Sequence, residues 1–352
     1  MLNVNLISNI SLEKLLDIPE TEPERLFERN NIKAQYHSLL KKWHPDVNSD
    51  PKAEKAVIKI GELYQQACSK DAAGIWELPN QRHYIGIDGK KREISYRTKR
   101  TFELGEMLIG NTIVAYILSL ENKDLYKKAI KNITNFKYAD KKMEEKVVSA
   151  LPILLSNFET IQTPNTPSKL ILIIKKTADQ ILLSDVLKHF NGKVPPEHTA
   201  WILSSLHNLS CWLAWAKISH QAISPEMIFV SPKNHSVSLL GGWWYATPYE
   251  EKITALTTRT MVSLPSEIIR SKTADRRTDL TLIKKTGREL LGDIPGTKVK
   301  SYPPLLAWLR TATGGDAIKD YQSWTKVRET TFGLRKFVPL NLSADDLYPD
   351  NS

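Results

Sequence analysis

The residues whose types and spacing suggest chemistry at a surface lie between positions 32 and 44. Basic side chains recur there every three or four residues, and they are Lys33, His37, Lys41 and His44. Apolar side chains recur beside them with a similar period, and they are Ile32, Tyr36, Leu39, Leu40 and Trp43. This period predicts an amphipathic α-helix with an apolar face for a core and a basic stripe beside it.

The basic helix is followed directly by Pro45 and Asp46, so that its last basic residue begins the tripeptide His44-Pro45-Asp46. Proline disfavours helical geometry at the residue before it and has no N–H to donate. We therefore expect the helix to stop at His44 and the tripeptide to lie in a loop.

The basic helix is expected to be the second of three helices in this part of the chain. Residues 11–17 form a short helix with Ser11 as its N-cap. The basic helix is expected to begin near Glu24, after Pro23, and Asp50-Pro51 is expected to open a third helix that runs to about position 69. Residues 1–72 are thus predicted to form a small all-helical domain.

This arrangement resembles the J domain of DnaJ-type cochaperones, in which a basic second helix ends in a His-Pro-Asp loop and a third helix packs back antiparallel. The residues that carry the resemblance are Ile32, Lys33, Tyr36, Leu39, Lys42, Trp43, His44, Pro45 and Asp46, with Ile60, Glu62 and Tyr64 in the third helix. The departures from the family pattern are Gln35, His37 and Gly61.

The resemblance implies that the loop and the basic helix dock on a DnaK-type heat-shock chaperone and stimulate its ATP hydrolysis. The trigger would be His44, Pro45 and Asp46, and the docking charges would be Lys33, His37, Lys41 and Lys42. Attraction to an acidic partner surface would weaken with salt, because exposed charges are screened. A solvated basic helix followed by an ordinary turn is the alternative interpretation of the same residues.

Composition limits the other classes of function. The 352 residues carry 49 Lys and Arg against 39 Asp and Glu, and the formal charge of +10 favours acidic partners. No block of five or six like charges appears, so nucleic-acid binding is not expected. The two cysteines, Cys68 and Cys211, cannot form the zinc module of full-length DnaJ proteins. With neither a signal peptide nor a membrane span in the sequence, we expect a soluble, cytoplasmic protein.

The rest of the chain is expected to change from strands to helices. A connector at 73–100, with a short strand at 83–87, leads to a β-rich part at 101–177, a helical part at 178–340 and a tail at 341–352 that is frayed from Asp345. The expected strands are 102–109, 112–120, 125–133, 158–162 and 170–174, with one helix at 140–155. Later helices are expected at 182–190, 198–218 and 279–291.

Five strands with an inserted helix, followed by a helical half, resemble the protein kinase fold. The fold class is therefore predicted as an all-α J domain joined to an α+β kinase-like domain with a small β-rich N-lobe and a helical C-lobe. The resemblance places a degenerate glycine-rich loop at Gly105 and Gly110, where Met107 replaces the second glycine. It places the nucleotide-binding lysine of the third strand at Lys131 and the paired glutamate at Glu144, with the neighbouring Glu145 as the alternative.

The catalytic signatures of kinases are lost in the segment 220–243. The positions of the catalytic aspartate, the metal-binding asparagine and the magnesium-binding aspartate are taken by Ala222, Met227 and Gly241. Phosphoryl transfer depends on a positioned base and on metal that neutralises the phosphate charge. The resemblance therefore implies a pseudokinase, although the scaffold positions 265–267 and Asp279 are kept.

These observations predict a J-domain cochaperone that is not an enzyme and needs no cofactor. Its kinase-like domain would be an adaptor for an unidentified client or complex. The alternative is an atypical Ser/Thr kinase or an ATP-responsive switch, with a relocated carboxylate such as Glu226.

Overall fold

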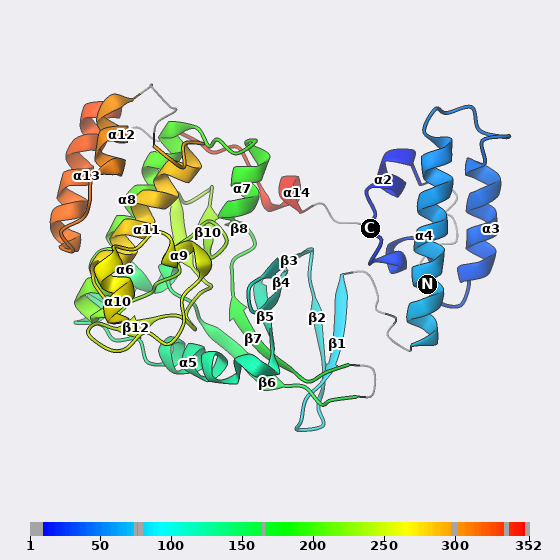
Figure 1. The fold of residues 1–352 in the computed structure, drawn as a ribbon, viewed down its shortest axis with the longest axis horizontal. Coiled ribbons are helices and arrows are strands. Elements are labelled where there is room, and N and C mark those ends of the chain that lie inside the picture. The colour runs from blue at the N-terminus through cyan, green and yellow to red at the C-terminus, as the bar shows by residue number, and fades with distance from the viewer. Residues whose placement is uncertain are drawn as a thin grey trace. The chain divides into compact units, whose positions relative to one another are not determined.

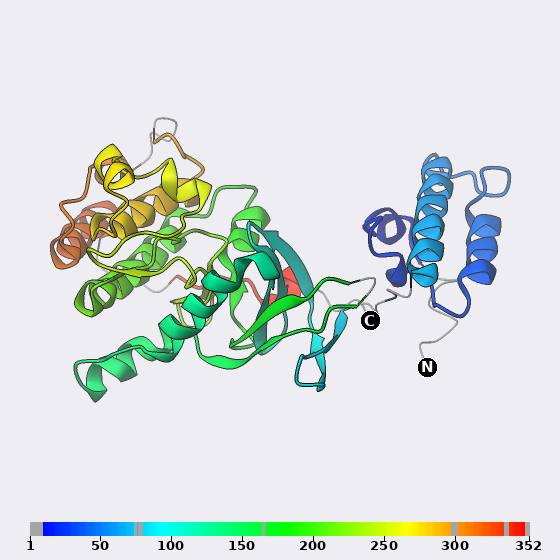
Figure 2. The ribbon, with the colours of Figure 1, turned by 60° about the horizontal axis from the view of Figure 1, so that its bottom comes forward.

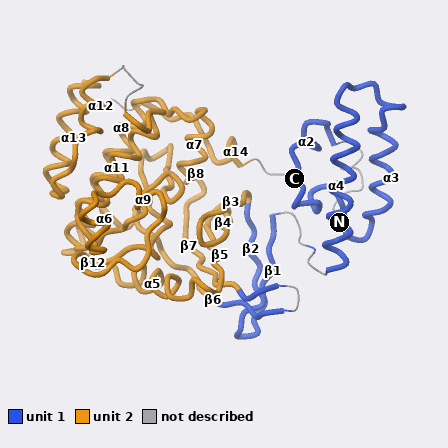
Figure 3. The backbone as a smooth tube through the Cα atoms, in the orientation of Figure 1, with its two compact units in different colours: residues 1–96, 159–168 blue, residues 97–158, 169–352 orange. Residues whose placement is uncertain are grey.

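The computed structural model describes residues 10–73, 76, 80–163, 166–296, 302–333 and 338–348. The chain forms two compact units (Figure 3). The first consists of Met1–Tyr96 with Glu159–Ser168, and the second of Arg97–Phe158 with Lys169–Ser352.

The first unit begins with helices and continues into a β-hairpin (Figure 1). The helices are α2 (Leu12–Leu16), the 3₁₀ turn η1 (Pro23–Arg25), α3 (Ile32–Trp43) and α4 (Ala53–Ala72). The hairpin consists of β1 (Gln81–Ile85) and β2 (Lys91–Ser95), so the expected connector at 73–100 contains an antiparallel ladder and more than one short strand. The predicted N-cap Ser11 is confirmed, because its hydroxyl accepts the backbone N–H of Lys14.

The apolar stripe of α3 lies against α4, as its period predicted. Leu39 on α3 and Ile60 and Leu63 on α4 are almost fully buried. The ring of Tyr36 stacks on the ring of Tyr64 with 4.0 Å between their centroids. Burial of such side chains contributes about 1.5–3 kcal/mol each to folding. Because the apolar face of α3 is held against α4, the opposite face of the helix is the one left exposed to solvent.

The start of the basic helix was predicted wrongly at Glu24. The chain makes only the 3₁₀ turn Pro23–Arg25 there, and α3 begins at Ile32. The backbone N–H of Glu28 donates to the side-chain oxygen of Gln35 (2.8 Å), so the approach to α3 is held by a side chain.

The second unit contains an antiparallel sheet of five strands with the order β3-β4-β5-β7-β6. The strands are β3 (Thr98–Phe102), β4 (Gly105–Ile109), β5 (Ile113–Ser119), β6 (Leu154–Glu159) and β7 (Lys169–Lys175). The chain between β5 and β6 forms η2 (Leu120–Asn122), α5 (Lys123–Thr134), α6 (Lys141–Val147) and η3 (Val148–Ala150).

Four predicted elements need correction. The strand predicted at 158–162 is displaced towards the N-terminus, because β6 covers Leu154–Glu159. The strand predicted at 125–133 is the helix α5, whose buried residues Tyr126, Ala129 and Ile133 recur with the period of a helix. The strand predicted at 102–109 is divided by a turn into β3 and β4, and the helix predicted at 140–155 gives way after Ala150 to β6. The strands predicted at 112–120 and 170–174 are confirmed as β5 and β7.

The other end of the second unit is helical (Figure 1 and Figure 2). Its long helices are α8 (Pro196–Ala216), α11 (Arg277–Leu290) and α13 (Ala317–Phe332), with α7 (Leu183–His189) and α12 (Pro303–Arg310). The short helices are α9 (Thr258–Met261), α10 (Ser266–Ser271) and α14 (Ala344–Leu347), and the short strands are β8 (Ile181–Leu182), β9 (Ile218–Ser219), β10 (Ile228–Ser231), β11 (Ser236–Leu239) and β12 (Thr247–Pro248). The predicted helices at 182–190, 198–218 and 279–291 are confirmed. In the part of the chain that the structure describes, no helix is long and apolar enough to cross a membrane.

The C-terminal segment is packed up to Tyr348, whereas the sequence predicted fraying from Asp345. The Tyr348 side chain is 2% exposed, and its hydroxyl donates to the Asp185 carboxylate (2.7 Å). The same hydroxyl accepts the backbone N–H of Leu182 (3.0 Å). These contacts join the end of the chain to the start of α7.

Candidate functional site

The His-Pro-Asp tripeptide lies in an exposed loop between α3 and α4. His44 leaves the helix with extended backbone (φ −61°, ψ 134°), as expected for a residue before proline. Its carbonyl accepts the backbone N–H groups of Val47 and Asn48, each at 2.9 Å. Its Nδ1 lies 3.3 Å from the backbone N of Asp46 and 3.4 Å from Oδ2 of the same residue. The two titratable side chains of the tripeptide therefore touch each other and remain open to solvent.

The predicted docking charges do not all face solvent. Lys33, His37 and Lys41 are exposed and follow one face of α3. Lys42 is half-buried: its Nζ donates to the carbonyl of Ile10 (3.2 Å) and lies 5.1 Å from the ring centroid of Trp43. The exposed stripe therefore consists of Lys33, His37 and Lys41, and it ends at the tripeptide.

The center of the second unit is filled by aromatic side chains. Tyr116, on the third strand of the sheet, lies 5.1 Å from Trp244 and 5.8 Å from Phe102 between ring centroids, and Phe102 lies 5.3 Å from Trp244. Burial raises the pKa of the Tyr116 hydroxyl. Sequence reasoning missed Tyr116, because the strand that carries it was counted as the second.

The three predicted degenerate positions meet beside this ring. Ala222 and Met227 are buried, and a Cβ added to Gly241 would lie 2.6 Å from the Tyr116 hydroxyl and 2.8 Å from the Met227 sulfur. A Cβ at Gly242 would lie 2.9 Å from that of Ala222. The local packing therefore leaves no room for a carboxylate at position 241.

The expected nucleotide pocket is not assembled by its four predicted residues. Gly105 and Gly110 lie at the two ends of β4 and not in one loop. Lys131 and Glu144 are exposed, on α5 and α6, because the run that contains Lys131 is a helix. The third strand of the sheet, β5, carries no lysine.

Two neighbours of Lys131 on α5 form hydrogen bonds with the segment 243–247. Asn132 donates its amide to the carbonyls of Trp243 and Ala246, both at 2.9 Å. Lys128 donates to the Thr247 hydroxyl (2.8 Å), and burial lowers its pKa. These side chains hold the segment 243–247 against α5. Lys128 begins the run 128–131 that resembles the kinase lysine motif, but the resemblance gave a role only to Lys131, and nothing in the sequence indicated Asn132.

Asp279 anchors the segment around His220, as predicted. Its carboxylate accepts the backbone N–H groups of His220 (2.7 Å) and Gln221 (2.8 Å). Burial raises the pKa of Asp279 to about 6, and the two hydrogen bonds oppose the rise. This anchor joins α11 to a segment almost sixty residues earlier in the chain.

The ring of His220 connects the same segment to Gly241. Its Nδ1 accepts the backbone N–H of Ala222 (3.3 Å), so the proton lies on Nε2, which donates to the Gly241 carbonyl (3.0 Å). Burial lowers the pKa of His220 to about 3, which keeps the ring neutral. Its contacts are structural, since the ring is fully buried.

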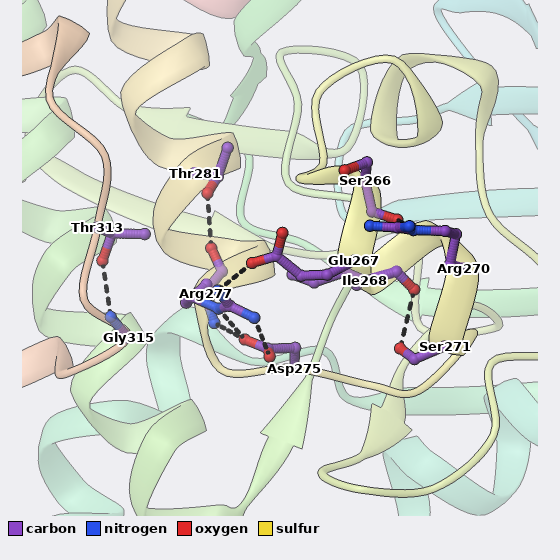
Figure 4. Close-up of polar contacts among 10 residues, drawn as sticks. All are labelled: Ser266, Glu267, Ile268, Arg270, Ser271, Asp275, Arg277, Thr281, Thr313 and Gly315. Carbon is purple, nitrogen blue, oxygen red and sulfur yellow. Dashed lines mark hydrogen bonds and ion pairs between the residues drawn. The ribbon is translucent and has the colours of Figure 1, made fainter.

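Glu267, one of the predicted scaffold positions, forms an ion pair near the start of α11 (Figure 4). Arg277 donates to Glu267 (2.8 Å) and to Asp275 (2.9 Å), and this guanidinium lowers the pKa of both carboxyl groups. The network fixes α10 against the start of α11. Among the described residues, no group of three His, Cys, Asp or Glu side chains could hold a metal ion.

Comparison with known proteins places one part of the chain in a family. A search of curated proteins found no match for the chain. The family model of the DnaJ domain matches residues 14–72, which contain α3, the exposed tripeptide and α4. Residues 14–72 are therefore a J domain.

Proposed function

We propose that this protein is a cochaperone that stimulates ATP hydrolysis by a DnaK-type heat-shock chaperone. The observation that carries the proposal is the exposed His44-Pro45-Asp46 loop at the end of the exposed stripe Lys33, His37 and Lys41, inside a J domain. The basic stripe attracts an acidic chaperone surface, and the loop then acts on the chaperone.

The test is the steady-state ATPase rate of the DnaK-type chaperones of the source organism, with the full chain added as wild type and as Asp46→Asn. Stimulation by the wild type alone supports the proposal, since the substitution removes one charge and keeps the shape of the side chain. Equal stimulation by both proteins, or none by either, contradicts it.

For the second unit we propose a kinase-like fold that does not transfer phosphate and serves as an adaptor for a client or complex. Support comes from the strand order and from α5 and α6, which are inserted after the third strand as in a kinase N-lobe. The Asp279 anchor is further support, because the resemblance assigned a scaffold role to this residue.

The side chains at the center of the unit support the lack of phosphoryl transfer. Kinases need a lysine on the third strand, a catalytic base and metal-binding carboxylates. The third strand of the sheet, β5, carries the buried Tyr116 and no lysine. The positions that the kinase pattern gives to the catalytic base and the metal-binding aspartate are Ala222 and Gly241, which have no side-chain group to accept a proton or bind metal.

A thermal-shift experiment with ATP and Mg²⁺ tests this second proposal against the nucleotide-responsive alternative. We expect the melting temperature of the full chain to stay unchanged, because aromatic rings fill the center of the unit. An increase that depends on ATP concentration would favour the switch.

A further inference from the structure

The side chain of Asn48 joins the two ends of the loop that carries the tripeptide. Its Nδ2 donates to the carbonyl of Lys42 in the last turn of α3 (3.3 Å), and its Oδ1 accepts the backbone N–H of Asp50 (3.0 Å). Its own backbone N–H donates to the carbonyl of His44 (2.9 Å). Asn48 thus forms hydrogen bonds with Lys42 before the tripeptide, with His44 inside it and with Asp50 after it.

Both partners need the amide of an asparagine. The Lys42 carbonyl is one of the last four of α3, which have no partner inside the helix, and it can only accept. The backbone N–H of Asp50 can only donate. A side chain that satisfies both must offer a donor and an acceptor in a fixed geometry, as a carboxamide does.

Asp50, which donates its backbone N–H to the Asn48 side chain, is itself held by hydrogen bonds. Asp50 accepts the backbone N–H of Lys52 with its side chain (2.8 Å) and that of Ala53 with its carbonyl (2.9 Å), so it holds the turn that leads into α4. The helix begins at Ala53 with Lys52 as its N-cap residue, two residues later than the predicted opening at Asp50-Pro51. The Asn48 amide therefore connects the end of α3 to the start of α4.

The tripeptide has few contacts of its own. The side chains of His44 and Asp46 are 50% and 85% exposed, and their polar contacts are with each other. Pro45 is exposed as well. The direction in which the tripeptide points is therefore set mainly at the base of the loop.

We propose that Asn48 is a positioning residue that holds His44, Pro45 and Asp46 in the orientation that acts on the chaperone. The inference rests on the proposed cochaperone function and deepens it. Without the amide, the ends of the loop are joined by backbone alone and the tripeptide samples several orientations.

Positioning and docking are separable in this structure. The exposed stripe Lys33, His37 and Lys41 lies on α3, whose burial against α4 does not involve Asn48. Loss of the amide should therefore leave the concentration for half-maximal stimulation near that of wild type. The maximal stimulation should fall several-fold.

The experiment titrates a DnaK-type chaperone with the full chain as wild type, Asn48→Ala and Ser49→Ala, and measures steady-state ATP hydrolysis. Ser49 is the matched control, because it is exposed in the same loop and its hydroxyl makes no hydrogen bond within the described part of the chain. We expect Ser49→Ala to match wild type and Asn48→Ala to lose maximal stimulation only. Wild-type stimulation by Asn48→Ala would overturn the inference.

A second variant separates the contact of Asn48 with the Lys42 carbonyl from its contact with the Asp50 N–H. Asn48→Asp keeps an acceptor for Asp50 but turns a carboxylate oxygen toward the Lys42 carbonyl, so we expect it to lose stimulation as Asn48→Ala does. Wild-type behaviour of Asn48→Asp would overturn the role of the Lys42 contact.

Amide hydrogen exchange provides a readout that does not depend on the chaperone. In Asn48→Ala the N–H groups of Val47 and position 48 should exchange faster, while those of Leu39 and Leu63 in the helices keep their protection. Unchanged exchange in the loop would overturn the inference, as would a general loss of protection in α3 and α4. If wild type itself fails to stimulate, the cochaperone proposal falls, and the exchange result still decides whether Asn48 braces the loop.

Discussion

Tyr116 and Gly241 are in contact across 125 positions of sequence, and the size of one residue fixes the size of the other. A Cβ on Gly241 would lie 2.6 Å from the Tyr116 hydroxyl. Tyr116 cannot turn aside, because Phe102 and Trp244 pack against its ring. Tyr116, Gly241, Phe102 and Trp244 thus form part of a closely packed core.

Gly241→Ala is expected to destabilise the second unit by about 1–3 kcal/mol, the usual cost of overpacking a core. Gly314→Ala is the matched control, since an added Cβ there meets nothing within 4 Å. The difference in stability is measured by urea unfolding that is monitored through tryptophan fluorescence. This signal reports mainly on the second unit, because only Trp43 and Trp76 of the nine tryptophans lie outside it. Equal midpoints for the two variants would contradict the packing argument.

Asn132→Ala is expected to lower the stability of the second unit by about 1–2 kcal/mol, because two carbonyls lose their donor. Lys131→Ala, one residue earlier and exposed, should change stability by less than about 0.5 kcal/mol. The comparison uses the same urea experiment. An effect of Lys131→Ala as large as that of Asn132→Ala would contradict the assignment of the stabilising contacts to Asn132.

The part of the fold that could be predicted from sequence is the part held by local patterns. The stripes of α3 and the stop at Pro45 follow from spacing within about a dozen residues. The run at 125–133 contains apolar residues whose types favour a strand and whose period favours a helix. The prediction followed the residue types and was wrong, because the run forms the helix α5. Tyr116 against Gly241, and Tyr348 against Asp185, are contacts between distant segments that no local pattern encodes.

Gly61→Ala is expected to stabilise the J domain by about 1 kcal/mol, because glycine is a poor helix former and α4 leaves open space at this position. Stimulation of the chaperone should not change. Gly89→Ala is the matched control: space is open there too, but φ is +74°, so alanine should destabilise the hairpin β1–β2. Thermal unfolding and hydrogen exchange of the full chain distinguish the two, and a loss of stability in Gly61→Ala would contradict the prediction.

The second unit is expected to lose stability as the pH falls below 6.5. Burial lowers the pKa of His207 to about 3, so the folded state resists a proton that the unfolded state binds near 6.5. Each such histidine contributes stability above 6.5 that declines by about 1.4 kcal/mol per pH unit below it. His220 acts in the same direction, whereas Asp279, whose folded pKa is about 6, opposes both between pH 6 and its ordinary value of 3.8.

His207→Phe tests the contribution of one histidine. The ring lies among Trp308, Tyr321 and Trp324, and within the described chain neither of its buried nitrogens has a hydrogen-bond partner. Phenylalanine keeps the aromatic packing and removes the titrating group. The loss in urea midpoint between pH 7 and pH 5.5 should therefore be smaller in the variant than in wild type, and an identical loss would show that His207 does not cause the acid sensitivity.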